Sequence, residues 1–364
     1  MAGNDAAPHP SAEDLVGRLL ESAVGALDLF SIYLGEKLGF YASLAGGGPA
    51  TSGELAARTG TNERYAREWL EQQATTQLLA VDDVAAEPDA RRYTLPEGYA
   101  SVLVDGESEM FVAPLGRFLT ASIGQAGALL EAYRSGGGVG WERFGHDMLS
   151  AQADFNRPFF LNSLVPGYLS QVAGLDEALR APGARVAEIG PGGGWAAIAI
   201  ARAYPGVRVD GFDLDAASAT IANKNAADAG LAGRVSIQQR DAGDASLAGE
   251  YDLVCAFECI HDLSDPVSVL GTMRRLAKSG GMVLVMDERV GESFGAIGDL
   301  MERLFYGFSM AVCLPDGMSR QPSAGTGTVM RPPTLRKYAQ QAGFREVEIL
   351  PLEHDMFRFY RMVG

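Results

Sequence analysis

Short apolar runs alternate with longer segments of helical periodicity from residue 184 onward, and this alternation limits the possible folds most. The runs occupy 184–190, 207–213, 234–241, 251–258 and 281–288. Apolar runs separated by helix-length segments are typical of a parallel sheet with helices on both faces. Two further runs, at 344–352 and 355–363, have only a short connection between them. We therefore predict an α/β, doubly wound sheet of seven strands with an antiparallel hairpin at one edge.

A glycine-rich turn follows the first of these runs. The sequence VAEIGPGGG places Glu188 at the end of the strand and Gly190, Gly192 and Gly194 in the turn. Ligands of open α/β sheets bind at the carboxyl ends of the strands, and glycine lets the backbone approach a ligand closely. A triphosphate loop needs Gly-Lys-Ser or Gly-Lys-Thr, whereas Trp195 follows here. A dinucleotide and S-adenosylmethionine both remain possible ligands of the turn alone.

The first third of the chain shows a winged-helix pattern. After an amphipathic helical stretch at 11–45, a short helix at 54–59, a turn at Gly60 and a second helix from Asn62 precede strand-like residues at 91–103. Residues 1–110 carry 7 Lys and Arg against 18 Asp and Glu, a balance of -11. Phosphate would repel such a domain, so we expect it to bind no nucleic acid and to serve dimerisation or to cover a substrate site.

Composition excludes several other classes of protein. The net charge is -16, which favours small molecules or proteins as partners over nucleic acid. The three cysteines form no CxxC pair, which argues against a disulfide framework and a zinc site and favours a reducing cytoplasm. No apolar stretch approaches the roughly 20 residues of a membrane span, and the first ten residues read as a polar, disordered leader. We expect no metal, membrane anchor or secretion signal.

The order of acidic residues after the glycine turn distinguishes between a dinucleotide and S-adenosylmethionine as its ligand. Asp213 ends the second run, 19 residues after Gly194, and Asp241 ends the third. Together with Glu188-x-Gly190-x-Gly192-x-Gly194, this order resembles class I S-adenosylmethionine-dependent methyltransferases, which have a Rossmann-like sheet. The resemblance implies that Glu188 lies near the amino-acid part of S-adenosylmethionine, that Asp213 binds the ribose hydroxyls and that Asp241 faces the adenine. It also implies cofactor contacts at Leu214, Ala242 and Phe257, while Asp215 is the expected N-cap of the next helix.

With its winged helix, the whole chain is similar to two-domain small-molecule methyltransferases, such as plant and actinobacterial O-methyltransferases and mycobacterial winged-helix enzymes. That resemblance implies a homodimer formed through the amino-terminal domain. We assign 1–110 to the winged-helix and dimerisation domain, 111–175 to a helical linker and substrate lid, and 176–364 to the cofactor-binding domain. An insertion at 291–330 is expected to cap the acceptor site.

The loop CIHDLSD after the fourth run carries the catalytic candidate, His261. It resembles the His-Asp-Trp-Ser-Asp loop of O-methyltransferases, although Leu263 replaces the tryptophan. The resemblance implies that His261 is a general base oriented by Asp287 or by its neighbour Glu288. Histidine is suited to accept a proton near neutral pH. The alternative is that His261 caps the helix that begins near Asp265 and that its ring is structural.

The sequence thus predicts methyl transfer to a small-molecule acceptor, with the hydroxyl oxygen of an aromatic or natural-product-like compound as the first expectation. Phe155, Tyr306 and Met310 are the candidate acceptor contacts, although aromatic residues at such spacing also occur in helix cores. N- or C-methylation without a strong base is the alternative. A ligand-responsive winged-helix regulator and a nicotinamide-dependent oxidoreductase are weaker hypotheses.

Overall fold

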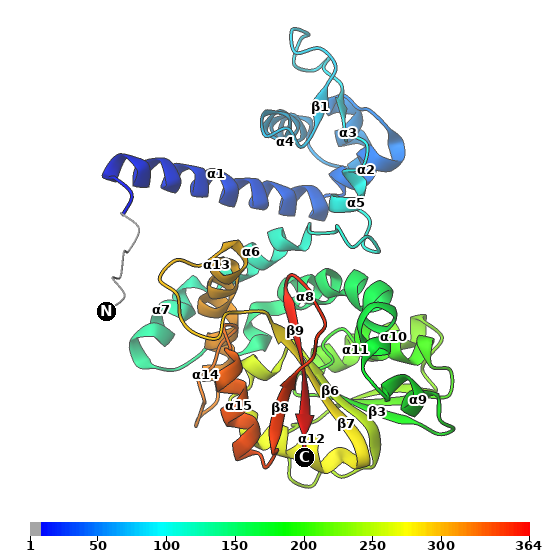
Figure 1. The fold of residues 1–364 in the computed structure, drawn as a ribbon. Helices are drawn as coiled ribbons and strands as arrows, with labels where there is room; N and C mark the ends of the chain where they lie inside the picture. The colour runs from blue at the N-terminus through cyan, green and yellow to red at the C-terminus, as the bar shows by residue number, and fades with distance from the viewer. Residues whose placement is uncertain (1–8) are drawn as a thin grey trace. The chain divides into compact units, whose positions relative to one another are not determined.

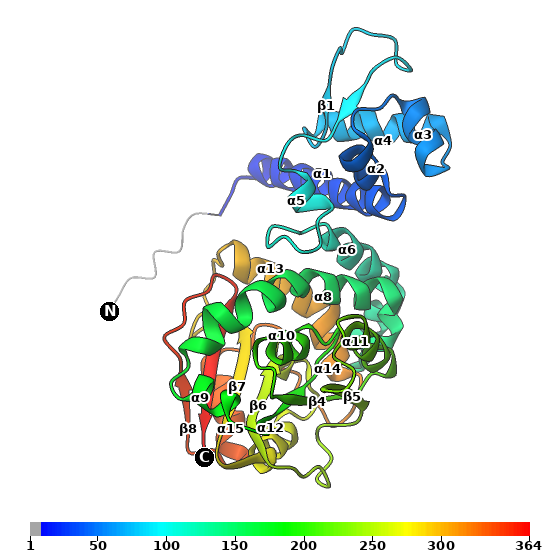
Figure 2. The same cartoon turned by 90° about the vertical axis from the view of Figure 1, so that its right-hand side faces the viewer.

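A computed structural model describes residues 9–364, which form two compact units divided between Thr120 and Ala121 (Figures 1 and 2). The leader expected over the first ten residues lies mostly outside the described residues. Among residues 9–364, no helix combines the length and the apolar character that a bilayer crossing requires.

The first unit contains the predicted helix-turn-helix. Its helices are α1 (Ala12–Lys37), α2 (Phe40–Gly47), α3 (Ser52–Thr59), α4 (Glu63–Thr75), α5 (Ala100–Leu103) and the start of α6 (Pro114–Gly124). Gly60, in the left-handed region at φ 67°, ends α3, and the Asn62 side chain caps α4. The stretch at 11–45 is two helices rather than one, because Gly39 adopts φ 71° between α1 and α2.

The wing is shorter than the sequence suggested. Strand β1 (Ala80–Val81) pairs antiparallel with β2 (Tyr93–Thr94). The expectation of strand-like structure up to residue 103 is wrong, since residues 100–103 form α5. Pro96 lacks a backbone N–H for a sheet ladder and Gly98 turns the chain at φ 83°, so the strand ends before them.

The second unit is built on the predicted seven-stranded sheet. Its strands are β3 (Arg185–Ile189), β4 (Arg208–Asp213), β5 (Val235–Gln239), β6 (Tyr251–Phe257), β7 (Ala277–Glu288), β8 (Glu346–Ile349) and β9 (Phe357–Val363). Their order is β5-β4-β3-β6-β7-β9-β8. The first five are parallel, whereas β9 is antiparallel to both β7 and β8, which confirms the hairpin at the edge.

Helices cover both faces of this sheet (Figure 2). Before the sheet come α7 (Ala126–Ser135), η1 (Trp141–Phe144), α8 (Gly145–Phe159), η2 (Phe160–Tyr168), η3 (Leu169–Gln171) and α9 (Leu175–Arg180). Between and after the strands come α10 (Trp195–Ala203), α11 (Ala216–Asp228), η4 (Ile260–Asp262), α12 (Pro266–Leu276), α13 (Leu300–Phe308), η5 (Ser309–Cys313), α14 (Leu314–Met318) and α15 (Pro332–Gln341).

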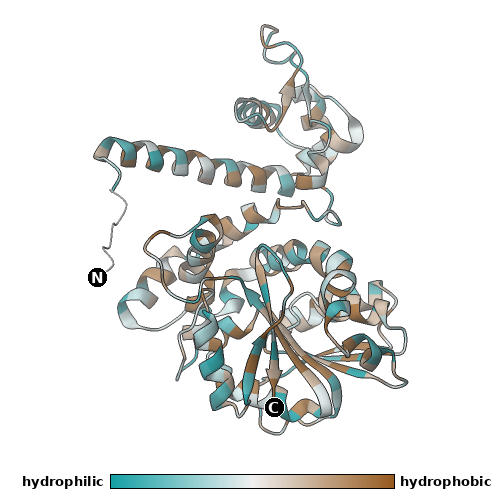
Figure 3. Ribbon diagram, viewed as in Figure 1, coloured by the Kyte–Doolittle hydropathy of each residue, from teal (hydrophilic) through white to brown (hydrophobic). Residues whose placement is uncertain are grey.

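Two hydrophobic cores lie on the two sides of the strands. One joins α10 and α11 to residues such as Val186 and Cys255, and the other joins α12 and α15 to their neighbours along the same strands, such as Ala187 and Val254. Apolar residues run along the central strands in Figure 3. Because both faces of the central strands are covered, the polar side chains of β3 and β6 lie near the ends of these strands.

Candidate functional site

The glycine turn directly follows β3 and leads into α10. Gly190, Gly192 and Gly194 have φ values of 63°, 51° and 75°, a region that favours glycine. A Cβ on Gly190 would lie 2.9 Å from Cys259, and one on Gly194 would lie 2.9 Å from Ala222. A Cβ on Gly192 would meet nothing within 4 Å. The turn is therefore packed at both ends and open at its centre.

Glu188 lies beneath this turn and is only 2% exposed. Its carboxyl group has a hydrogen bond with the backbone of Ala197 in α10, while its Oε2 atom has no partner among the described residues. Burial raises the pKa of Glu188 to about 8. A buried carboxyl with one oxygen unpaired is costly unless a ligand completes its hydrogen bonding.

Asp213 ends the neighbouring strand β4 and binds the turn directly. Its carboxylate accepts hydrogen bonds from the backbone N–H groups of Gly192, at 3.0 Å, and Asp215, at 2.9 Å. Burial raises the pKa of Asp213 to about 6, although these backbone hydrogen bonds oppose the rise. Leu214 beside it is 42% exposed, and Asp215 caps α11 as predicted. Asp213 and Gly192 thus form one continuous surface at the strand ends.

The other predicted cofactor positions lie at the ends of β5 and β6. Asp241 follows β5, is exposed and accepts a hydrogen bond from the Gly243 N–H at 2.7 Å. Ala242 is buried beside it. Phe257, the last residue of β6, is also buried, and its ring packs against Phe160 with centroids 6.2 Å apart. The side chain of Phe257 belongs to the core, so only its backbone is available at the strand end.

His261 lies in η4, immediately after β6, and is 3% exposed. Its Nδ1 atom lies 2.7 Å from Oδ1 of Asp287 at the end of β7, with hydrogen-bond geometry. Glu288 Oε2 lies 2.9 Å from the same nitrogen, and Asp262 Oδ1 lies 3.2 Å from Nε2, both without such geometry. The structure therefore brings His261 together with both carboxylates that were considered, and Asp287 is the hydrogen-bonded one.

The charge around His261 is dominated by acids. Burial alone would lower the pKa of His261, but the nearby carboxylates Asp262, Asp287 and Glu288 outweigh it and raise the pKa well above the usual value. Asp265, not His261, caps α12, since its carboxylate accepts from the Ser268 N–H at 3.0 Å. The alternative role of His261 as a helix cap is therefore wrong.

Sequence reasoning missed Glu258, which lies three residues before His261. It is a non-glycine residue with positive φ, at 54°, and its Oε2 accepts a hydrogen bond from the Asn156 side chain of α8 at 3.3 Å. Its Oε1 is buried without a partner among residues 9–364. Burial raises the pKa of Glu258 to about 8. An acid directly after the fully buried strand YDLVCAF was the signal in the sequence.

The predicted acceptor contacts are spread over three helices. Phe155 lies on α8, Tyr306 on α13 and Met310 on η5. Tyr306 is 42% exposed, and its hydroxyl accepts a hydrogen bond from Arg331 at 3.3 Å. Met310 is 57% exposed, and its carbonyl accepts from the Tyr133 hydroxyl at 3.1 Å. The side chains of Tyr306 and Met310 are therefore accessible, whereas Phe155 is partly buried.

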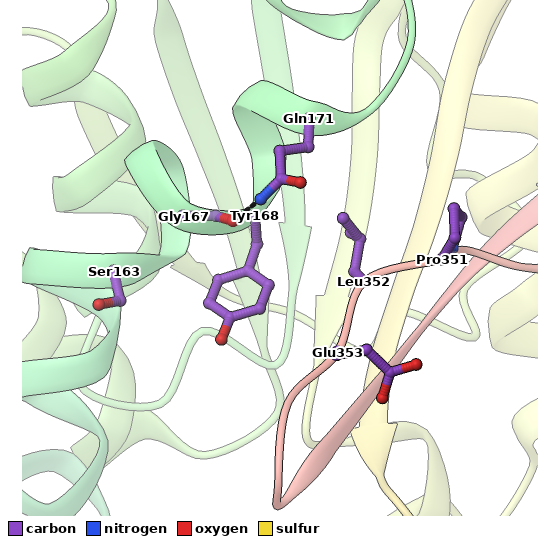
Figure 4. A pocket seen from close by; sticks show the side chains of 7 residues that line it. All are labelled: Ser163, Gly167, Tyr168, Gln171, Pro351, Leu352 and Glu353. Carbon is purple, nitrogen blue, oxygen red and sulfur yellow. Dashed lines mark hydrogen bonds between the residues drawn. The ribbon is translucent and has the colours of Figure 1, made fainter.

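A separate surface depression of about 470 Å³ lies between the residues of η2 and η3 and the connection from β8 to β9 (Figure 4). Its lining residues are Ser163, Gly167, Tyr168, Gln171, Pro351, Leu352 and Glu353. None of these is among the site residues predicted from the sequence. The chemistry-bearing groups of the second unit lie instead at the ends of β3, β4, β6 and β7.

Comparison with known proteins identifies both parts of the chain. Residues 167–349 match the family described as methyltransferase domain, and residues 25–105 match the Rv2258c-like winged HTH domain. The chain is 25% identical over 213 residues to a ubiquinone biosynthesis O-methyltransferase of Aromatoleum aromaticum, which covers 58% of this chain and 82% of that protein. It is 34% identical over 103 residues to the polyketide synthase ThaQ of Burkholderia thailandensis, covering 28% of this chain but only 5% of the synthase.

Solved structures show the same fold over nearly the whole chain. Human N-acetylserotonin methyltransferase in complex with S-adenosylmethionine superposes with a TM-score of 0.68 and 20% identity, over 98% of this chain and 99% of that one. The residues at the strand ends fit this cofactor, because the centre of the glycine turn is open and Glu188 has an unpaired buried oxygen. The chain therefore belongs to the methyltransferase-domain family and is an S-adenosylmethionine-dependent methyltransferase with an amino-terminal winged-helix domain.

Proposed function

We propose that the enzyme transfers a methyl group to a hydroxyl oxygen of a small aromatic or natural-product-like acceptor, with His261 as the general base. The supporting observation is the 2.7 Å hydrogen bond between His261 Nδ1 and Asp287, in a site that is almost closed to solvent. The similarity to an enzyme named as an O-methyltransferase also favours oxygen as the methylated atom.

S-adenosylmethionine, when bound, supplies an electrophilic methyl group on a positively charged sulfur. Glu188, the glycine turn and Asp213 would hold it, with Leu214, Asp241, Ala242 and the Phe257 backbone along its length. These groups come from adjacent strand ends, so the sheet fixes their spacing. Most of the catalysis is then positioning of the acceptor.

Asp287 fixes the state of the base. When the Nδ1–H group donates a hydrogen bond to the Asp287 carboxylate, the lone pair of the neutral ring is at Nε2, which can then accept the hydroxyl proton of the acceptor. The negative charge of Asp287 also stabilises the imidazolium that results. The raised pKa of His261 means that its neutral, basic form becomes abundant only at higher pH. Turnover should therefore increase as the pH rises.

N- or C-methylation remains the second candidate, for a specific reason. His261 Nε2 lies 3.2 Å from Asp262 Oδ1. Polar atoms of His261, Asp262 and Cys313 all lie within 4.8 Å of one another. Because Nε2 of His261 faces protein groups in this arrangement, it is less available to an acceptor. This favours an acceptor, such as a neutral amine, that needs no strong base.

We also propose that the first unit forms a homodimer in the cytoplasm and binds no nucleic acid. Helix α1 carries apolar side chains that are 47–64% exposed: Leu15, Val16, Leu19, Leu20, Val24 and Leu27. Exposed apolar surface of this extent favours a protein partner. The domain assignments 1–110, 111–175 and 176–364, with a capping insertion at 291–330, are part of this proposal.

Turnover of a panel of phenols, carboxylic acids and amines with labelled S-adenosylmethionine tests the base. The variant His261→Ala should bind S-adenosylhomocysteine like the wild type but methylate hydroxyl acceptors about 10²- to 10⁴-fold more slowly, the usual contribution of a general base. Unchanged turnover of a hydroxyl acceptor would exclude the general-base role. Methylation of amines alone, insensitive to the substitution, would favour the second candidate.

A further inference from the structure

Glu258 is an acid at the strand ends that the proposed mechanism does not use; the residue is half-buried, but its Oε1 atom is buried. It directly follows β6, which pairs with β3 so that Ala256 lies opposite Ile189. Cys259, the next residue, packs so closely on Gly190 that a Cβ there would lie 2.9 Å from its side chain. Glu258 therefore belongs to the segment that forms the wall beside the glycine turn.

The position of Glu258 along the sheet indicates which part of the cofactor it meets. The strand order places β4 and β5, with Asp213 and Asp241, on one side of the glycine turn, and β6 and β7 on the other. If the adenosine of the cofactor lay on the Asp213 side, its sulfur and methyl group would lie toward the β6 side. That side carries Glu258 and the carboxylate at the end of β7.

The geometry of Glu258 shows that its carboxyl group has bonding capacity left. Asn156 of α8 donates to Oε2 at 3.3 Å, and the backbone N–H of Glu258 donates to the Met286 carbonyl at 2.8 Å. The φ of 54° is rare for a residue with a side chain, and glycine would relieve it. Oε1 is buried and has no hydrogen-bond partner among the described residues. The side chain is thus held in place with one acceptor oxygen unused.

We propose that Glu258 is the electrostatic partner of the sulfonium, so that this enzyme distinguishes S-adenosylmethionine from S-adenosylhomocysteine by charge. The two compounds share their adenosine and amino-acid parts and differ in the methyl group and the positive charge on sulfur. A buried carboxylate attracts the charged compound only, since burial weakens the screening of the interaction. The inference rests on the cofactor assignment and not on the proposed oxygen acceptor.

A consequence is that binding of the charged cofactor releases a proton. The groups that face Glu258 are His261 and Asp262 of η4, Asp287 of β7 and the Asn156 amide of α8. Burial raises the pKa of Glu258 to about 8, so the free enzyme holds a proton there at pH 7. A positive charge nearby favours the ionised form and lowers this pKa, which expels the proton. The affinity for S-adenosylmethionine should therefore rise with pH up to about 8, more steeply than that for S-adenosylhomocysteine.

Calorimetric titration with both compounds, from pH 6.5 to 9 and in buffers of different ionisation enthalpy, tests the inference without any acceptor. Glu188 and Asp213 face parts that the two compounds share, so their titration cancels in the ratio of the two dissociation constants. We expect wild-type enzyme to release more protons on binding S-adenosylmethionine. Glu258→Gln should shift the ratio by roughly ten- to hundredfold against the charged compound, as expected for unit charges about 6 to 12 Å apart at an effective dielectric of about 20. The control Asp265→Asn removes an equal charge from an exposed residue and keeps the cap of α12, so it should leave the ratio unchanged.

Two outcomes would overturn the inference in different ways. An equal ratio at every pH, in wild-type protein and in Glu258→Gln, would exclude a charge-selective role for Glu258 and leave the methyltransferase assignment intact. Failure of both compounds to bind wild-type protein would refute the cofactor assignment as well. If Glu258→Gln does not fold, the comparison of proton release in His261→Ala decides instead, because that variant lacks the other group from which a nearby cation would expel a proton.

Discussion

Replacing Asp287 by Asn tests how the site sets the protonation state of His261. The substitution keeps the size of the side chain but removes the carboxylate that lies 2.7 Å from Nδ1. Hydrogen bonds to charged groups contribute about 1.5–3 kcal/mol, and each 1.36 kcal/mol corresponds to one pKa unit. Because both residues are almost fully buried, solvent screens little of this interaction. We therefore expect the pKa of His261 to fall by about one to two units in Asp287→Asn.

The direction of the change in the pKa of His261 determines how stability and turnover depend on pH. Asp287 favours the charged imidazolium and contributes to the raised pKa of His261. The stability that the folded protein gains from the pairing of Asp287 with His261 is fully present below the pKa of an unfolded histidine. It is lost as the pH rises through the pKa of His261 in the folded protein. In Asp287→Asn this loss should occur at lower pH, and the rising limb of the turnover profile should move to lower pH as well. Turnover at the optimum should still fall, since Asn no longer stabilises the imidazolium.

NMR titration of the histidine ring protons measures the pKa directly. The chain has only four histidines, and His261→Ala identifies the signal of His261. Glu288→Gln is the matched control, because Glu288 Oε2 also lies near Nδ1, at 2.9 Å, but without hydrogen-bond geometry. A His261 titration that is unchanged in Asp287→Asn, or that moves further in Glu288→Gln, would refute the assignment of Asp287 as the orienting carboxylate.

Two further predictions concern the cofactor turn and the first unit. Gly192→Ala should fold with its free energy of unfolding lowered by about 1–2 kcal/mol, because the backbone there is left-handed. It should lose most of its affinity for the cofactor, because the added methyl group enters the open centre of the turn. Gly194→Ala would place a methyl group 2.9 Å from Ala222, so it should lose more stability in denaturant titrations. Equal cofactor affinity of Gly192→Ala and the wild type would contradict this assignment. Leu19→Glu, which replaces one of the exposed apolar side chains of α1, should convert a dimer into monomers in light scattering without lowering the Tm of the second unit, and a wild-type protein that is already monomeric would refute the proposed interface.

The sequence predicted the catalytic sheet well because each strand is a local signal. Every run buried on both faces became a strand, and the glycines with positive φ marked the turn after β3. The same local logic predicted the Asp215 cap and the hairpin of β8 and β9. Where one residue overrides a periodic pattern, the prediction failed: Gly39 divides the first helical stretch, and Pro96 with Gly98 ends the wing.

The environment of the site was harder to predict, because it depends on long-range packing. The loop motif suggested His261 and its partner, but not that Asp262, Asp287 and Glu288 all surround one ring. The bond between Asn156 and Glu258 joins residues 102 positions apart, and no spacing rule connects them. The positions of Phe155, Tyr306 and Met310 relative to an acceptor also depend on the packing of separate helices.

The excess of carboxylates around one histidine is difficult to explain from the proton transfer alone. A base needs one orienting carboxylate, and each further buried acid raises the pKa of His261 and reduces the neutral form at a given pH. The excess is reasonable for a site that also accommodates a positive charge, because a cation near the acids lowers the pKa of His261 and of Glu258 together. Binding of the charged methyl donor would then shift His261 toward its neutral, basic form. Product formation would remove the positive charge from the sulfur and return His261 to the protonated form. The acids of β6 and β7 would in this way couple the readiness of the base to the charge state of the cofactor.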